Sequence, residues 1–355
     1  LPHEGVVLVF TVVAIATLEL LPVTYPRSAI LLAWARPMAA MLTVGLAIAM
    51  CTRSLFRRWF PTQLSLLSEL ILMCRLAASL LITMSLHFLL KSFIFLINPR
   101  VWDRELGRLD KVVHLGIDPP GLLAILFGNR ILLHLVDVTY SSLYLVMIVV
   151  YTSVFLGVLP PRRRVAFVAA FCFVWILGIL FYVILPTWGP VFVVPEKYAA
   201  TLQFMPTTVA VQHVLYREIS SLVRDPLGPR VVVFGCVAAF PSLHVAIVAL
   251  FTLVSRTIWG RWFQVNVGFL AVMIVGSVIS GYHYLIDAYA GLGLAGFAWW
   301  AGRALFDQSL PTPPRGSPTA DCVGAVAPGQ RRLGVESADG SSHRPRCQDG
   351  PLLRP

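Results

Sequence analysis

The chain has 355 residues, of which 57% are hydrophobic and only 13% are charged, and its formal net charge is +11. A soluble domain carries about 25% charged residues, so this chain has too few polar side chains to cover a water-exposed surface. The composition therefore excludes soluble enzymes, nucleic-acid-binding proteins and small disulfide-stabilised secreted domains. It predicts an all-α fold, a polytopic membrane helix bundle.

Apolar runs long enough to cross a bilayer, about 20 residues, recur along the chain. The predicted spans are residues 5–21, 29–51, 64–97, 133–158, 164–186, 241–257, 264–282 and 283–304. Arg36-Pro37 interrupts the second span, and the third is long enough to bend or to end before Lys91. A break near Gly281 separates the last two spans, so we expect about eight crossings.

Arginine residues set the expected orientation of these spans. They cluster in the short connections after the second, fourth and sixth spans, which are residues 52–61, 160–164 and 255–262. Basic loops stay in the cytoplasm. We therefore expect a multi-pass plasma-membrane protein with both termini in the cytoplasm and the longer connections, residues 98–132 and 187–240, outside.

The composition divides the chain into three parts. Residues 1–60 hold two spans that precede a six-span core in residues 61–306, whereas residues 307–355 are rich in Pro, Gly, Ser and Arg. A segment of that kind cannot bury a core. We expect it to be a disordered cytoplasmic tail that is dispensable for the chemistry.

The first outward connection has a helical pattern of its own. Leu106, Leu109 and Val113 recur at helical spacing beneath a charged face, which favours a short helix lying in the membrane interface. A solvated linker is the alternative. Just beyond it, His134 and Asp137 are three residues apart, and we expect a structural polar pair there, with a catalytic part as the alternative.

Metal and disulfide chemistry are not predicted. No CxxC or Cys/His ligand spacing occurs, and Cys51, Cys74 and Cys172 lie in apolar runs, where a thiol behaves as a small hydrophobic group. We expect neither a metal nor a cofactor. Glu19 and Glu69, which lie inside spans, are expected to face the bundle and to be hydrogen-bonded.

Two segments place ionisable groups at the predicted outer ends of spans. Residues 240–244 read Phe-Pro-Ser-Leu-His and open the sixth span, and residues 281–287 read Gly-Tyr-His-Tyr-Leu-Ile-Asp and open the eighth. Ionisable groups near a membrane span are costly and mark function by default. Because both segments face outward, we predict that His244 and His283 meet in one active site.

The spacing within these segments suggests a role for each residue. His283 and Asp287 are four apart, so on a helix the carboxylate holds the imidazole and leaves its other nitrogen as a nucleophile. Ser242 follows Pro241 at a helix start, where N–H groups and the helix dipole favour an anion such as phosphate. His244 is placed to protonate a leaving oxygen.

These motifs resemble the second and third signatures of the type 2 phosphatidic acid phosphatase superfamily. The resemblance covers about residues 98–304 and implies a six-helix core. It also implies metal-independent cleavage or transfer of lipid phosphate through a phosphohistidine. By this resemblance His283 is the nucleophile, Asp287 orients it and His244 is the general acid.

The chain departs from the other signatures of the superfamily. An Arg that often lies six residues before the nucleophilic His is Ser277 here, and the first signature, Lys-x6-Arg-Pro, reads Lys91 with Asn98-Pro99. Arg100 lies just beyond. Lys91 and Arg100 are therefore the favoured phosphate-binding residues. Further basic candidates in the outer connections are Arg104, Lys111, Lys197, Arg217, Arg224 and Arg230.

These departures are similar to those of the inositol-phosphorylceramide synthase (inositolphosphotransferase) branch, which moves a phosphoryl headgroup between lipids. Residues 103–118, 180–190 and 239–246 also look like that branch. The resemblance favours a lipid or polyprenyl phosphate donor with an alcohol acceptor, and hydrolysis is the alternative. A proton-coupled transporter and a hydrolase with a metal on the two histidines and Asp287 are the remaining alternatives.

Overall fold

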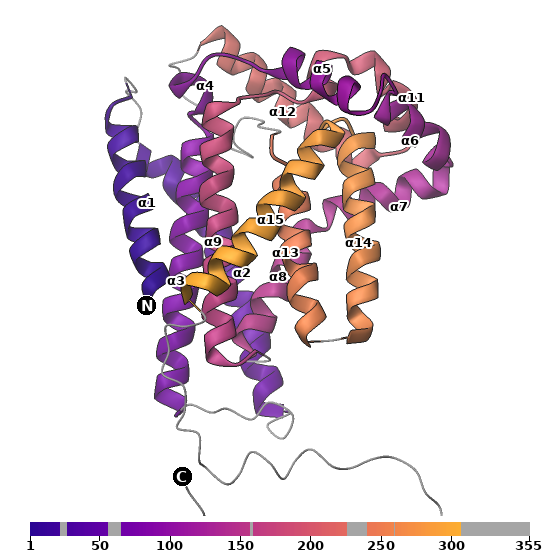
Figure 1. Cartoon of the computed structure of the whole chain (residues 1–355). Helices are drawn as coiled ribbons and strands as arrows, with labels where there is room; N and C mark the ends of the chain where they lie inside the picture. The colour runs from indigo at the N-terminus through magenta and orange to yellow at the C-terminus, as the bar shows by residue number, and fades with distance from the viewer. Residues whose placement is uncertain (22–26, 56–64, 157–158, 226–239, 259, 307–355) are drawn as a thin grey trace, which may run out of the picture. The chain divides into compact units, whose positions relative to one another are not determined.

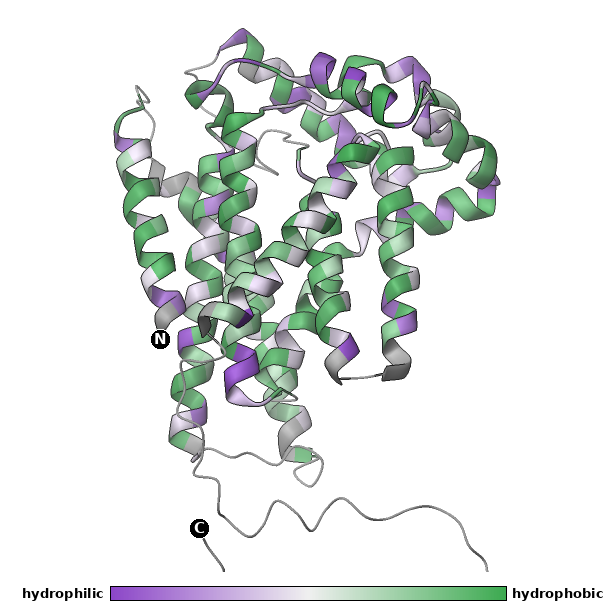
Figure 2. Ribbon diagram, in the orientation of Figure 1, coloured by the Kyte–Doolittle hydropathy of each residue, from purple (hydrophilic) through white to green (hydrophobic). Residues whose placement is uncertain are grey.

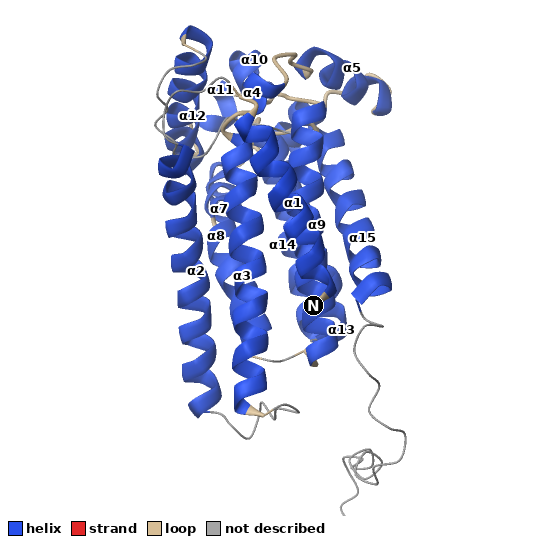
Figure 3. Cartoon of the chain, turned by 90° about the vertical axis from the view of Figure 1, so that its left-hand side faces the viewer, coloured by secondary structure: helices blue, strands red, loops and turns tan. Residues whose placement is uncertain are grey.

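The computed structural model describes residues 1–21, 27–55, 65–156, 159–225, 240–258 and 260–306, and every regular element in these ranges is a helix (Figures 1 and 3). The prediction of an all-α membrane bundle is confirmed. Within the described ranges, α2, α3 and α9 are long and apolar enough to cross a membrane, and a bent pair, α6 and α7, passes the same test together. The predicted tail, residues 307–355, lies outside these ranges.

Long helices occupy the positions of the predicted spans. They are α1 (Pro2–Glu19), α2 (Arg27–Leu55), α3 (Leu66–Lys91), α8 (Leu143–Phe155), α9 (Pro161–Ile184), α13 (Leu243–Ile258), α14 (Gly260–Ile279) and α15 (Leu285–Phe306). Helix α2 continues unbroken through Pro37, and α3 ends at Lys91, as the sequence allowed. Gly281, at a φ of 75°, separates α14 from α15 at the predicted break.

Shorter helices gather at one end of the long ones (Figure 1). They are α4 (Ile94–Ile97), α5 (Asp103–Val113), α6 (Pro119–Phe127), α7 (Arg130–Ser141), α10 (Pro190–Val193), the 3₁₀ helix η1 (Pro195–Lys197), α11 (Ala199–Leu202) and α12 (Pro206–Arg224). Figure 2 shows hydrophilic residues at this end and at the opposite end, with hydrophobic residues between them. The first residues of α13 and α15 lie at the end that the short helices cover.

The core is built by α9, α13 and α15, which pack against one another. At Gly291 a Cβ atom would come within 2.5 Å of the Ser242 carbonyl oxygen, so α15 approaches the start of α13 at backbone distance. Helix α2 contacts both α3 and α8, and its Trp34 ring stacks on Phe88 of α3 at 4.2 Å. Helix α1 also contacts α3, so both N-terminal helices pack directly against the rest of the bundle.

The helix ends that flank the predicted basic connections lie at the opposite end of the bundle. The facing ends of α2 and α3, of α8 and α9, and of α13 and α14 all lie there (Figure 1). Near that end Arg164 makes a bidentate ion pair with Glu69, at 2.5 and 3.0 Å, and both side chains are buried. Glu69 therefore faces the bundle and is paired, as predicted.

The fourth predicted span, residues 133–158, is wrong in its first half. The helix breaks at Ser142, α7 is turned away from the direction of α8 (Figure 1), and α6 and α7 meet at 117°. The cause lies in Asp137, whose carboxylate accepts the N–H groups of Thr207 and Thr208 at 2.9 and 2.8 Å and so ties α7 to the first turn of α12. His134 is exposed, so the expected His134–Asp137 pair does not form.

Helix α5 exists where the sequence predicted it, but it buries a different face. Its buried residues are Asp103, Leu106 and Asp110, whereas Leu109 and Val113 are half exposed. Two carboxylates thus point into the protein. Asp110 accepts the N–H of Ile286 at 3.0 Å, so α5 caps the start of α15 from outside the helix.

Candidate active site

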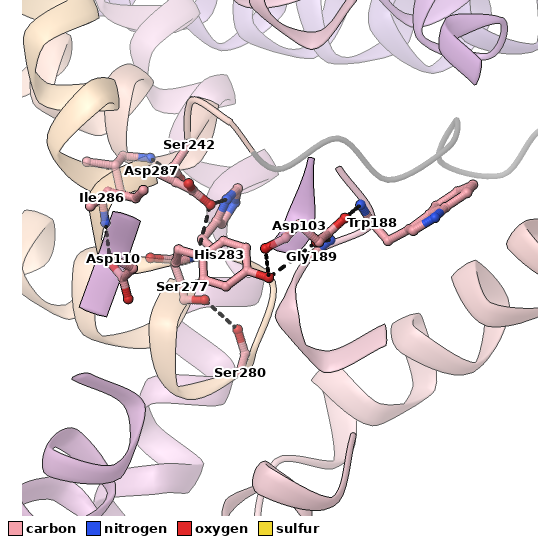
Figure 4. A network of polar contacts seen from close by, with 12 residues as sticks. Asp103, Asp110, Trp188, Gly189, Ser242, Ser277, Ser280, His283, Ile286 and Asp287 are labelled. Carbon is pink, nitrogen blue, oxygen red and sulfur yellow. Dashed lines mark hydrogen bonds and ion pairs between the residues drawn. The ribbon is translucent and has the colours of Figure 1, made fainter. Parts of the chain in front are cut away.

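Ser242 forms the start of α13, as the sequence predicted. It is fully buried, and its Oγ accepts the Val245 N–H at 3.5 Å, in the position of an N-cap. The Ser242 N–H donates to the carbonyl oxygen of Asp287 at 2.9 Å. The start of α13 is therefore joined directly to the first turn of α15, and Figure 4 shows Ser242 beside Asp287. This join brings His244, two residues after Ser242, next to the His283 segment.

His283 and Asp287 lie together, although not along one helix face. Because α15 begins at Leu285, His283 precedes the helix and Asp287 is its third residue. The Asp287 Oδ2 lies 3.4 Å from His283 Nδ1 and accepts the Tyr284 N–H at 2.9 Å. The carboxylate thus reaches back over the helix start, as the acid of a capping box does, and from there it lies beside the imidazole.

The residue that replaces the superfamily arginine also holds His283. Ser277 is buried, its hydroxyl donates to the Ile274 carbonyl at 2.8 Å, and its own carbonyl accepts the His283 N–H at 3.1 Å. In the first signature, Asn98 donates to the Val183 carbonyl at 2.8 Å and helps to close the end of α9. Both substituted positions therefore support the backbone around the site.

The two histidines meet, with ring centroids 6.2 Å apart. Tyr140 of α7 stacks on the His244 ring at 4.8 Å and lies 5.8 Å from Tyr282. Aromatic stacking of this kind fixes a ring orientation. Tyr140 could not be singled out from sequence, because a tyrosine in an apolar run carries no motif and its contact with His244 depends on the turn of α7.

A cavity of about 370 Å³ adjoins both histidines. Apart from His244 and His283, its walls are mainly apolar and aromatic, with contributions from α3, α7, α8, α9, α12 and α13. His87 of α3 is a third histidine in this lining, and sequence reasoning missed it. A mainly apolar pocket with a few convergent polar groups is the usual form of a small-molecule site.

The structure separates the two predicted phosphate-binding cations. Lys91 lines the cavity, and its Nζ lies 5.6 Å from the Tyr182 ring centroid. Arg100 instead stacks on Trp102 at 3.6 Å and pairs with Glu105 at 3.5 Å. Among the described residues that line the cavity, Lys91 is the one Lys or Arg.

The remaining basic candidates lie elsewhere on the protein. Lys197 pairs with Asp118. Arg104, Lys111, Arg217 and Arg224 are exposed, and Arg230 lies outside the described residues. The position of Lys91 in the cavity therefore supports its predicted part in substrate binding. Substrate binding by Arg100 stays a prediction, and its contacts with Trp102 and Glu105 do not favour it.

The two buried carboxylates of α5 connect this helix by hydrogen bonds to the residues around the site. Asp103 accepts the N–H groups of Trp188 and Gly189 at 2.8 and 2.9 Å, and the Tyr284 hydroxyl donates to its carbonyl at 3.0 Å (Figure 4). Burial raises the pKa of Asp103 and that of Asp110, and the backbone N–H groups they accept oppose the rise. Residues Asp103 and Asp110 therefore bind Tyr284 and Ile286, which follow His283 in the chain.

The fold and site define an integral-membrane helix bundle with paired histidines at one end of its spans. A family model described as the PAP2 superfamily matches residues 104–301, more than half of the chain. The chain belongs to the PAP2 superfamily, whose members are phosphatases and phosphotransferases. No curated protein and no solved structure matches it. The matched segment contains Ser242, both paired histidines and Asp287, whereas Lys91 precedes it.

Proposed function

We propose that this protein is a lipid phosphotransferase that works through a phosphohistidine on His283. The observation that carries the proposal is the convergence of His283, held by Asp287, with His244 on one largely apolar cavity. A buried carboxylate on Nδ1 selects the tautomer whose Nε2 attacks. This arrangement matches nucleophilic catalysis better than the proton relay of a transporter, because both histidines line a cavity of ligand size.

In the first half-reaction, His283 Nε2 attacks the phosphorus of a lipid phosphoester. The N–P bond forms, the bond from phosphorus to the leaving oxygen breaks, and His244 gives that oxygen its proton. Lys91 and the start of α13 supply positive charge for the phosphoryl oxygens. In the second half-reaction an acceptor oxygen attacks the phosphorus, the N–P bond breaks, and the acceptor's proton passes to a base in the cavity.

Transfer to an alcohol is favoured over hydrolysis by the walls of the cavity. Leu143, Met147, Trp175, Leu215 and Ile247 are among its lining residues, and an apolar, water-poor site slows competing hydrolysis. The resemblance to the inositol-phosphorylceramide synthase branch favours the same reading. Hydrolysis of a lipid or polyprenyl phosphate is the alternative, in which water takes the phosphoryl group instead.

We also propose that the site faces away from the cytoplasm. Arg163 and Arg256 are exposed near the end of the bundle opposite the cavity, and positively charged connections stay cytoplasmic. The donor would then be a lipid of the outer leaflet. Both termini would lie inside, in keeping with the alternation of the long helices.

The decisive experiment uses the purified full chain in detergent, with phosphorus-labelled phosphatidic acid and phosphatidylinositol as donors and with alcohols added or withheld. We expect an acid-labile phosphoenzyme, product label in the alcohol, and activity unchanged by a chelator. His283→Ala should abolish both the phosphoenzyme and the labelled product, whereas His213→Ala, at an exposed position of α12, should retain both. Full turnover by His283→Ala would overturn the mechanism, and free phosphate as the sole product would favour the hydrolase.

A further inference from the structure

His87 is a buried histidine on the wall of the active-site cavity that neither signature motif includes. It is 1% exposed, it lies on α3 before the segment that the family model matches, and it lines the same cavity as His244 and His283. An imidazole within a membrane span is costly and needs a reason. Its surroundings indicate which reason applies.

The contacts of His87 fix both its tautomer and its orientation. Its Nδ1 lies 3.0 Å from the carbonyl oxygen of Trp175. A carbonyl only accepts, so Nδ1 carries the proton and Nε2 carries a lone pair. The rings of Trp175, Phe88 and Tyr182 meet the imidazole edge at 4.7, 5.3 and 5.8 Å. The imidazole is thus held as a hydrogen-bond acceptor, and its complement is a hydroxyl group of a ligand.

Lys91 lies one helical turn beyond His87, on the same side of α3, and lines the cavity with it. Helix α3 thus offers a cation and a neutral acceptor, while α13 and the segment before α15 offer the paired histidines. A phosphoryl group on His283 attracts the cation. His87 and His283 line the same cavity, so the lone pair of His87 is an acceptor for a hydroxyl bound in that cavity.

We propose, on the basis of the phosphotransferase function above, that His87 binds the acceptor alcohol and is its general base. The alcohol O–H donates to His87 Nε2. As the alcohol oxygen forms its bond to phosphorus, the N–P bond to His283 breaks and the alcohol's proton moves to Nε2. Once the product has left, solvent that enters the cavity returns that proton to His244, which lost one to the leaving oxygen, so the cycle closes without a cofactor.

The test separates the two half-reactions in the full-length protein. His87→Phe keeps an aromatic ring of similar size but removes the acceptor. We expect the phosphoenzyme to form from labelled phosphatidylinositol at close to the wild-type rate, and transfer to the alcohol to fall by about 10²-fold or more. The rising limb of the pH profile for transfer should disappear. His134→Phe, at an exposed position of α7, makes the same change outside the cavity and should leave both half-reactions intact.

A second variant shows whether a loss of transfer comes from the missing acceptor or from misfolding. His87→Asn retains an N–H that can donate to the Trp175 carbonyl, but it has no group in place of Nε2, so it should fold and still lose transfer. Transfer within threefold of wild type by either variant, with a normal phosphoenzyme, would overturn the role of His87. An equal loss in both half-reactions would also overturn it, because that is the result of a structural role. Failure of the wild type to form any phosphoenzyme would instead reject the proposed function itself.

Discussion

Asp287→Asn is the most informative substitution at the site, because it changes one charge and little else. The carboxylate of Asp287 is fully buried, lies 3.4 Å from His283 Nδ1 and accepts the Tyr284 N–H at 2.9 Å. An asparagine oxygen can still accept that backbone N–H, so the start of α15 should survive. Because the same oxygen, Oδ2, also faces His283 Nδ1, the asparagine keeps a neutral acceptor there and loses the negative charge that stabilises the imidazole.

The expected loss follows from the interaction that is removed. A hydrogen bond to a charged group contributes about 1.5–3 kcal/mol, and each 1.4 kcal/mol corresponds to about tenfold in rate. Loss of the bond alone would therefore slow the first half-reaction by about 10- to 150-fold. We therefore expect a loss of that size in the rate of phosphoenzyme formation.

The assay is the single-turnover rate of phosphoenzyme formation in detergent, with the melting temperature measured alongside. Asp110→Asn is the matched control. It makes the same change at another buried aspartate that binds the start of α15, through the Ile286 N–H at 3.0 Å, without touching His283. The rate of phosphoenzyme formation by Asp110→Asn should stay within about threefold of the wild-type rate. A rate for Asp287→Asn within tenfold of wild type, with an unchanged melting temperature, would refute the orienting role.

Three further predictions concern packing, pH and topology. Gly291→Ala should lower the free energy of unfolding by about 1–3 kcal/mol, because its Cβ would lie 2.5 Å from the Ser242 carbonyl oxygen. Gly293→Ala has open space around its Cβ and should not lower it, and thermal unfolding compares the two variants. Burial raises the pKa of Asp110, so the folded state holds its proton more tightly and stability falls as pH rises above the unfolded pKa of about 4. The melting temperature of Asp110→Asn relative to wild type should therefore rise between pH 4 and 7, and a flat difference would contradict this. In a cysteine-free background, an impermeant thiol reagent outside intact cells should label Leu115→Cys but not Arg163→Cys, and the reverse result would invert the orientation.

The sequence was most informative where one local pattern decides the structure. The apolar run of α9 and the glycine break before α15 both appear in the structure. The convergence of His244 with His283 also followed from sequence, because loop charges placed both at one end of the bundle. For the apolar run of α9 and the glycine break, residues close together in the chain carry the whole signal.

The sequence was least informative where partners come from distant segments. Nothing near Ser142 marks the end of α7, since the bend depends on Asp137 and the first turn of α12. The inward face of α5 was missed because Asp103 is stabilised by amides about 85 residues further along the chain. His87 lacks a motif, and only the shared cavity relates it to the site.

The turn between α7 and α8 has a consequence for the membrane itself. Helix α8 has 13 residues, so it rises only about 20 Å, whereas the hydrocarbon core of a bilayer is about 30 Å thick. We therefore expect the bilayer beside α8 to thin locally, to match so short an apolar surface. The first turn of α8 contributes Leu143 and Tyr144 to the cavity, so the thinning falls beside the site. A donor headgroup there would have less distance to descend before its phosphorus reached the histidines.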